Sequence, residues 1–218
     1  MEVKLRLQFH WILAVFAVSA CAGTCAGQYR VMPGTLDAHG MPTAPARICL
    51  AASGSGHCYA PPSDKYAFGL EPKAQTVGNL NGQDLVLFTA SFSSGGNGHL
   101  THLAILKQQS SDLVDLLPQV QLTNQSEYKL WNLPQFSNMP VLVTADYIWD
   151  IAAEETHFSA HRYHIEAFVF DAPSGQYVQV FHCGTLKKYP GLDDVDAVKV
   201  LDAEKPAILA KLKKGLAN

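Results

Sequence analysis

Alternation of apolar and polar residues dominates the chain after residue 45 and predicts an antiparallel, mainly β fold. Short segments rich in glycine, asparagine, serine and proline separate the alternating stretches, as in sandwiches and barrels. The expected strands are 46–51, 57–60, 73–77, 84–92, 100–107, 128–133, 141–149, 160–171 and 176–185. We therefore expect residues 46–218 to form a single antiparallel β-sandwich or barrel-like domain that ends in one α-helix.

The clearest hairpin is the last one, in which strands 160–171 and 176–185 flank a turn that contains proline and glycine. Pairing Asp171 with Gln176 fixes the register, because side chains alternate between the two faces of a strand. The resulting opposite residues are Val169 and Val178, Ala167 and Val180, Ile165 and His182, and His164 and Cys183. Both faces are rich in apolar groups, which predicts a central hairpin that is covered on two sides.

Helical periodicity appears at the carboxyl terminus, over residues 202–217. Asp202 is the expected cap, which would leave Pro206 in the first turn, where proline is tolerated. The apolar face carries Ile208, Leu209, Leu212 and Leu216, with lysines opposite. We expect this face to pack on the β domain; a basic helix lying on a membrane surface is the alternative.

The first 22 residues have the order of a secretory signal peptide: a short positively charged segment, an apolar run and small residues. Lys4 and Arg6 carry the charge, residues 11–18 form the apolar run, and residues 19–23 are small. The run is too short to span a bilayer as a helix, which needs roughly 20 residues. Export from the cytoplasm is therefore predicted.

Two processing sites fit this signal. Val18-Ser19-Ala20-Cys21 resembles the lipobox of bacterial lipoproteins, which implies lipidation at Cys21 and retention on a membrane through acyl chains. An ordinary cut after Ala22 is the alternative. The expected location is thus the periplasm, an outer membrane as a lipoprotein, or the exterior.

The composition of the whole chain is that of an ordinary globular protein. Net charge is −3, with 16% charged and 48% hydrophobic residues. No basic patch for nucleic acid, no phosphate-binding loop and no cofactor motif is present, so no cofactor and no nucleic-acid partner are expected. Residues 23–45 contain several prolines and glycines and are predicted to be a linker or a strap over the domain.

The cysteines fit an oxidising compartment. Cys49 and Cys58 flank a small-residue turn, and we expect a disulfide between them. Cys183 is then expected to pair with Cys25. An inert free thiol is the first alternative. The second follows from the predicted hairpin register, which places the Cys183 thiol beside His164 as a nucleophile and its base.

Histidines and glutamates gather between residues 154 and 166 and suggest a metal site. Its candidate ligands are His157, His161, His164 and Glu166. On a helix His157 and His161 would share a face, but on a strand they would lie roughly 13 Å apart. Surface or core-edge histidines are the simpler interpretation.

Aromatic residues among turns and polar residues suggest recognition instead. The candidates are Tyr128, Trp131, Phe136, Tyr147 and Trp149. The sequence therefore favours an exported or envelope-anchored, non-catalytic module that binds a protein or a glycan. A hydrolase, either metal-dependent or using a Cys/His pair, and a structural envelope protein are the alternatives.

Overall fold

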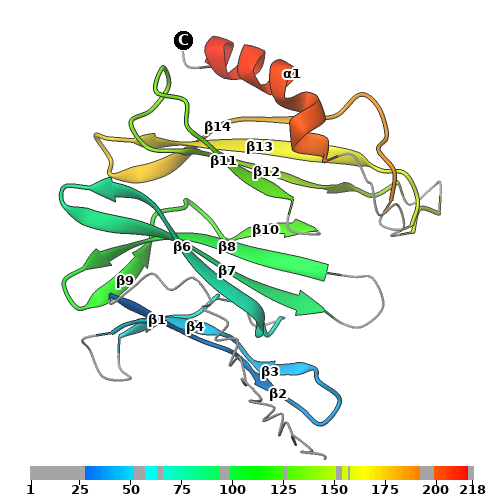
Figure 1. The fold of residues 1–218 in the computed structure, drawn as a ribbon. Coiled ribbons are helices and arrows are strands. Elements are labelled where there is room, and N and C mark those ends of the chain that lie inside the picture. The colour runs from blue at the N-terminus through cyan, green and yellow to red at the C-terminus, as the bar shows by residue number, and fades with distance from the viewer. Residues whose placement is uncertain are drawn as a thin grey trace, which may run out of the picture.

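The computed structural model of the chain describes residues 28–51, 57–62, 66–93, 99–124, 127–150, 154–156, 158–191 and 199–215. Antiparallel strands dominate these residues, and the helix α1 (Val200–Gly215) follows them. The predicted mainly β class with a carboxyl-terminal helix is therefore confirmed. Figure 1 shows the sheets stacked in layers, with α1 on the outside of the last layer. The predicted signal peptide, Cys21 and Cys25 lie outside the described residues.

The layer farthest from α1 is a small sheet in the order β1-β4-β5. Its strands are β1 (Tyr29–Met32), β4 (Arg47–Leu50) and β5 (Cys58–Tyr59). A separate pair is formed by β2 (Thr35–Leu36) and β3 (Pro42–Ala44). The segment expected to be a linker or strap thus supplies three short strands, and β1 pairs along the whole of β4.

A disulfide joins two of these strands. Cys49 of β4 lies opposite Cys58 of β5, with a Cα–Cα distance of 4.1 Å, and the two sulfurs are bonded. The predicted Cys49–Cys58 crosslink is confirmed. Because such bonds persist in oxidising compartments, it indicates that the protein works outside the reducing cytoplasm.

The middle sheet has five strands in the order β10-β8-β7-β6, and β9 pairs with the remainder of the β8 edge. The strands are β6 (Leu70–Leu80), β7 (Gln83–Ser93), β8 (His99–Gln109), β9 (Asp112–Asp115) and β10 (Gln121–Asn124). Asn81 and Gly82 both have positive φ (55° and 82°) in the β6–β7 turn. That conformation is the one for which an Asn-Gly pair is favoured in tight hairpins.

The third sheet has the order β11-β12-β13-β14. Its strands are β11 (Tyr128–Trp131), β12 (Val141–Ile148), β13 (Arg162–Asp171) and β14 (Gln176–Gly184). Of the two hairpin strands, β13 has the predicted central position, and its second half is covered on both faces, whereas β14 is an edge strand of this sheet. The edge position explains why several residues of β14 are exposed, including Val178 at 38%.

Three apolar cores hold the layers together. The first lies between the small sheet and the middle sheet and includes Ile48, Phe68 and Phe88. The second lies between the middle and third sheets and includes Leu87, Ile105 and Phe168. The third lies between the third sheet and α1 and includes Val143, Ile165, Leu201, Ile208 and Leu212. The middle sheet is therefore covered on both faces.

The predicted register of the last hairpin is correct only near its turn. Asp171 pairs with Gln176 and Val169 with Val178, as expected. A bulge then leaves Val180 without a partner residue, so Ile165, rather than His164, lies opposite Cys183. His164 pairs with Gly184, and the predicted Cys183–His164 neighbourhood does not form. Because the bulge adds one residue to β14, each later residue of β14 pairs with a different residue of β13 than predicted.

The helix also begins earlier than expected. α1 starts at Val200, so Asp202 lies in its first turn and is not the cap. Pro206 consequently falls within the helix and not in the first turn, where the sequence had placed it. The predicted packing face is correct, because Ile208 and Leu212 are buried against the third sheet. Among the described residues, no helix has both the length and the apolar character that crossing a membrane requires.

Candidate functional site

A polar groove of about 350 Å³ opens where β10 of the middle sheet lies next to β12 of the third. Its walls come mainly from β12 and β13, with one residue from β10. The lining residues are Leu122, Thr144, Asp146, Tyr147, Ile148, His164 and Glu166. We refer to this feature as the intersheet groove.

Strand pairing brings the polar groups of the intersheet groove together. Glu166 lies opposite Thr144, and His164 lies opposite Asp146, across the β12–β13 ladder. Toward the other end of the same face, Phe168 packs into the core between the sheets. Because alternate residues of a strand share a face, the apolar core and the polar groove form one continuous surface. The groove is the part of that surface where the inward side chains become polar.

A hydrogen bond orients Glu166, and ring packing positions His164. Gln179 on β14 donates its side-chain N–H to Glu166 Oε1 at 2.9 Å. His164 Nε2 lies 3.9 Å from the same oxygen, and the His164 ring packs at 5.7 Å, centroid to centroid, from the ring of His182. The His164 side chain is 46% exposed and that of Glu166 24%. The site is therefore ordered by its neighbours but open to water.

The groups in the intersheet groove suit a ligand that carries several hydroxyls. Ionised carboxylates only accept hydrogen bonds, a threonine hydroxyl donates and accepts, and a neutral imidazole does one with each nitrogen. Asp146, Glu166, Thr144 and His164 thus present all the complements that hydroxyl groups need. Leu122 and Ile148 add apolar surface for the C–H side of such a ligand.

The four predicted metal ligands are not brought together as one set. His164 and Glu166 share the intersheet groove, whereas His157 lies outside the described residues. His161 is fully buried at the start of β13, where its Nε2 lies 2.8 Å from the Thr156 carbonyl oxygen. Among the described residues, no group of three or more His, Cys, Asp or Glu side chains is arranged to hold a metal ion.

His161 instead belongs to a buried cluster that closes the loop before β13. Its Nδ1 lies 3.3 Å from Glu155 Oε2, although not in hydrogen-bond geometry, and its ring stacks on Tyr147 with 4.2 Å between centroids. Lys188 donates to Glu155 Oε1 at 2.5 Å. That hydrogen bond lowers the pKa of Glu155 to about 2. We interpret the cluster as structural, because His161 is fully buried and the side chain of Glu155, which Lys188 holds, is only 4% exposed.

The five aromatic residues predicted to bind a partner do not form one surface. Trp131 and Phe136 pack in the core beneath α1, together with Tyr147. Tyr128 packs beside the core between the two larger sheets. Trp149 alone of the five is substantially exposed, at 40%, and its ring lies 4.8 Å from that of His161.

A second buried polar chain joins the small sheet to the middle sheet. The Tyr59 hydroxyl lies 3.0 Å from His102 Nε2 and donates to Asp115 Oδ2 at 3.3 Å. Burial lowers the pKa of His102 to about 4 and raises that of Asp115 to about 6. Backbone N–H groups of Ile105 and Leu117 donate to the other Asp115 oxygen. His102 is fully buried, whereas Tyr59 and Asp115 are half-buried, and all three lie between the two sheets. We therefore interpret these hydrogen bonds as fixing the layers rather than binding a ligand.

Within the described residues Cys183 has a free thiol. Its expected disulfide partner, Cys25, lies outside them, so that pairing stays a prediction. It projects toward α1 with Ile165, away from the intersheet groove. The groove residues Thr144 and Asp146 were missed by sequence analysis. Their alternation with Ile148 was visible, but the pairing of β12 with β13 that places them beside His164 and Glu166 was not predicted.

Comparison with protein-family models, with curated proteins and with solved structures finds no match for this chain. No relative therefore assigns a role to the groove or to any of its residues.

Proposed function

We propose that the protein is an exported, non-catalytic module that binds a glycan in the intersheet groove. The observation that supports this most directly is the convergence of Thr144, Asp146, His164 and Glu166 on one open groove. Sugar hydroxyls donate to carboxylates and exchange hydrogen bonds with imidazole and threonine hydroxyl groups. Their C–H faces pack on small apolar surfaces such as those of Leu122 and Ile148.

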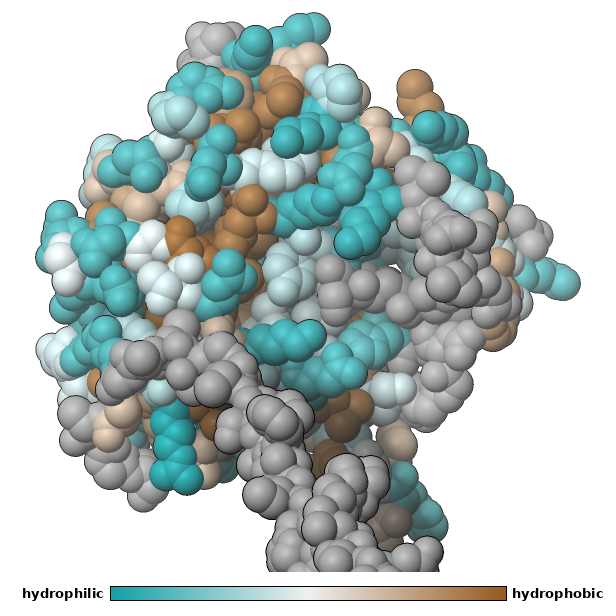
Figure 2. Space-filling model, in the orientation of Figure 1, coloured by the Kyte–Doolittle hydropathy of each residue, from teal (hydrophilic) through white to brown (hydrophobic). Residues whose placement is uncertain are grey.

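A glycan fits this surface better than a large protein partner does. Protein interfaces bury roughly 800 Å² on each side and have a dry, apolar centre. On the face shown in Figure 2, hydrophilic side chains separate the exposed apolar ones among the described residues. The lining of the groove is itself mainly polar. Recognition by several directed hydrogen bonds is therefore favoured over burial of an extended apolar patch.

Catalysis by the same residues is the second candidate, because His164 lies between two carboxylates, Asp146 and Glu166. Catalytic groups work best in sites that exclude water, where electrostatic interactions are strong. His164 is nearly half exposed, which favours reversible binding over bond cleavage. The Cys183–His164 pair no longer supports a hydrolase, since the two residues are not opposite each other.

Export and anchoring belong to the same proposal. Two features support a location in the periplasm, on an outer membrane or outside the cell. They are the order of charged, apolar and small segments in residues 1–22 and the Cys49–Cys58 disulfide. Lipidation at Cys21 would hold the module at a membrane surface through its acyl chains. A purely structural envelope protein would have the same location but would not need an open polar groove.

Binding is tested by titrating the mature protein with soluble cell-wall and storage oligosaccharides and following backbone amide shifts by NMR. We expect one class of oligosaccharide to move the resonances of Thr144, Asp146 and Glu166. Asp146→Asn and Glu166→Gln should each weaken binding about tenfold, since each removes a charge-assisted hydrogen bond. Asp112→Asn is the matched control, because Asp112 is an exposed carboxylate on β9 that does not line the groove.

The outcomes separate the candidates. Equal affinity in all three variants, or shifts confined to other surfaces, would reject the groove as the glycan site. Mass spectrometry of the oligosaccharide after long incubation tests catalysis. Cleavage that is lost in the His164→Gln variant would replace the binding function with the hydrolase.

A further inference from the structure

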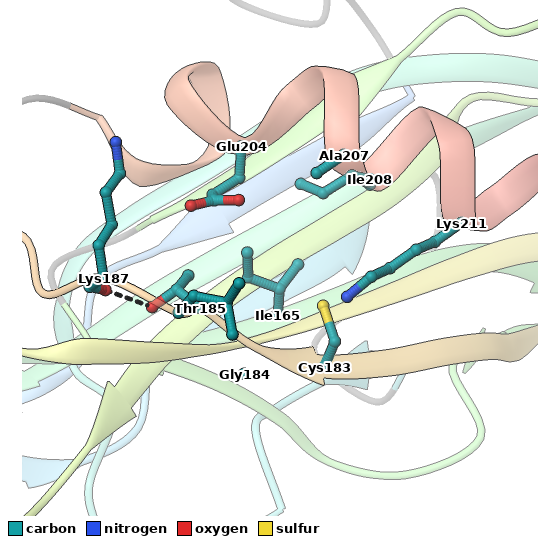
Figure 3. Close-up of a pocket in the computed structure, with 10 residues that line it drawn as sticks. Ile165, Cys183, Gly184, Thr185, Lys187, Glu204, Ala207, Ile208 and Lys211 are labelled. Atoms are coloured by element: carbon teal, nitrogen blue, oxygen red, sulfur yellow. Dashed lines mark hydrogen bonds between the residues drawn. The ribbon is translucent and has the colours of Figure 1, made fainter.

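A second cavity lies on the other side of the third sheet, between α1 and the end of β14. It has a volume of about 290 Å³ and is separate from the intersheet groove. The side chains that matter for its chemistry come from β13, β14 and α1: Ile165, Cys183, Glu204, Ala207, Ile208 and Lys211. Figure 3 shows these side chains converging from the helix above and the strands below. We call this cavity the helix cleft.

The floor of the helix cleft is apolar. Ile165 and Ile208 are each only 1% exposed and belong to the core between the third sheet and α1. Ala207 contributes a small side chain, which leaves the space above Ile165 open. A ligand in this position would therefore bury an apolar group against two branched aliphatic side chains.

One cation of the cleft, Lys211, forms no ion pair with any residue that the structure describes. Figure 3 shows Lys211 extending along the cleft, with its ammonium pointing toward the Cys183 sulfur. Within the part of the chain that the structure describes, no carboxylate forms an ion pair with Lys211, whereas Lys129 and Lys188 each have one. Lys211 therefore offers an unused positive charge directly above an apolar floor.

The other charged groups near the cleft are already engaged. The carboxylate of Glu204 accepts a hydrogen bond of 2.5 Å from the Tyr189 hydroxyl, and Figure 3 shows it directed away from Lys211. The ammonium of Lys187 lies 4.8 Å above the Tyr189 ring. The net charge available to a ligand within the cleft is thus positive and is located at Lys211.

We propose that the helix cleft binds a small apolar carboxylate, whose anionic group pairs with Lys211 and whose apolar body packs on Ile165 and Ile208. The positive charge of Lys211 favours a carboxylate, and the apolar floor favours a ligand in which the carboxylate is attached to an apolar group. A water molecule takes about 30 Å³, so the cleft has room for a ligand of about ten non-hydrogen atoms. This site is independent of the glycan proposal, because the two cavities share no lining residue.

The test uses 3-phenylpropionate as the probe and 3-phenylpropionamide as its uncharged counterpart. We expect the carboxylate to bind the mature protein with a Kd on the order of 1 mM and to shift the amide resonances of Cys183, Ala207 and Ile208. The amide should bind at least fivefold more weakly. Occupancy should also slow alkylation of the Cys183 thiol, which peptide mapping distinguishes from the other cysteines.

Three variants make the test specific. Lys211→Gln should remove the preference for the carboxylate over the amide, and Ala207→Leu should abolish binding of both by filling the cleft. Lys213→Gln is the matched control, since it removes a lysine two residues along the helix that does not line the cleft. All three positions are exposed, so each variant should fold.

Two results would overturn the proposal. One is the absence of shifts at Cys183, Ala207 and Ile208 when the carboxylate reaches 10 mM, about ten times the expected Kd. The other is an equal change in carboxylate affinity in the Lys211→Gln and Lys213→Gln variants. Failure of the glycan titration would not affect either measurement, because it reports on the opposite face of the third sheet.

Discussion

Cys183 lies directly opposite Ile165 across β13 and β14, and both side chains face α1. Opposite residues of an antiparallel pair have Cβ atoms about 4.5–5.5 Å apart, which is close enough for a disulfide after small adjustments. An Ile165→Cys variant should therefore crosslink to Cys183 under mild oxidation. A His164→Cys variant should not, because His164 faces the other side of the sheet. Peptide mapping under non-reducing conditions distinguishes the two; crosslinking of the His164→Cys variant alone would restore the unbulged register.

The Cys49–Cys58 disulfide should stabilise the small sheet. A crosslink that closes a loop of this length, with a sequence separation of 9, contributes about 2–3 kcal/mol to unfolding free energy. Replacing both cysteines with alanine should lower the denaturant midpoint accordingly, and dithiothreitol should have the same effect on the native protein. Cys183→Ala is the control: with the free thiol removed, the sensitivity to dithiothreitol should be unchanged.

Titration of Asp115 and titration of His102 should change the free energy of unfolding with pH in opposite directions. Burial raises the pKa of Asp115 from 3.8 to about 6, so its stabilising effect is complete below pH 3.8 and is lost as pH rises through 6. Burial lowers the pKa of His102 from 6.5 to about 4, so its effect is complete above pH 6.5 and is lost as pH falls through 4. In the native protein the two trends offset each other.

Asp115→Asn should separate these trends. The amide oxygen retains an acceptor for the backbone N–H groups of Ile105 and Leu117, while the titration disappears. Relative to the native protein, the variant should gain up to about 3 kcal/mol in unfolding free energy between pH 4 and pH 8. Urea titrations at the two pH values measure it. A pH profile identical to that of the native protein would show that Asp115 does not titrate in this range.

Glu155 should matter most near neutral pH. Its pKa is lowered to about 2 by the hydrogen bond from Lys188, so its stabilising effect is present above pH 4.5 and is lost as pH falls through 2. Glu155→Gln should therefore destabilise the protein at pH 7 and have little effect at pH 2. Glu154→Gln, at the preceding position, is the matched control. Equal effects of the two variants at pH 7 would argue against the Glu155–Lys188 pair.

Leu212 anchors α1 to the third sheet. Its side chain is fully buried in the core that includes Val143 and Leu201. Truncation to alanine should cost about 2–4 kcal/mol through lost burial and the cavity left behind. Lys213→Ala, one residue further along and exposed, should change the unfolding free energy by less than about 0.5 kcal/mol. Similar values for both variants would mean that the helix contributes little to stability.

Local signals explain what the sequence could predict. Asn81-Gly82 identified the β6–β7 hairpin because asparagine and glycine adopt the positive φ of a two-residue turn more readily than other residues do. The Cys49–Cys58 bond was predictable because a short, glycine-containing segment joins its halves. The bulge at Val180 was not, because Val178, Val180 and Phe181 are all apolar and alternation does not mark the extra residue.

The candidate site depended on long-range pairing. His164 and Glu166 were visible as a cluster, but Thr144 and Asp146 are about twenty residues away in sequence and join them only through the β12–β13 ladder. The aromatic candidates failed to form a surface for the opposite reason. Trp131 and Phe136 are buried by α1, an element that begins about 65 residues later. Burial of that kind is decided by tertiary packing, which alternation within one strand does not record.

The middle sheet is enclosed on both faces, and this has a consequence for the order in which the chain acquires structure. Strands β6 to β9 pair with sequence neighbours, so the interior layer assembles from nearby segments. β1, β4 and β5 are synthesised before it, yet most of the core that covers Ile48 and Leu50 comes from β7 and β8, including Phe88 and Leu106. The small sheet can therefore pack onto the middle sheet only after β7 and β8 have been made. Mutations in β7 and β8 should slow folding more than those in β1, which should instead speed unfolding.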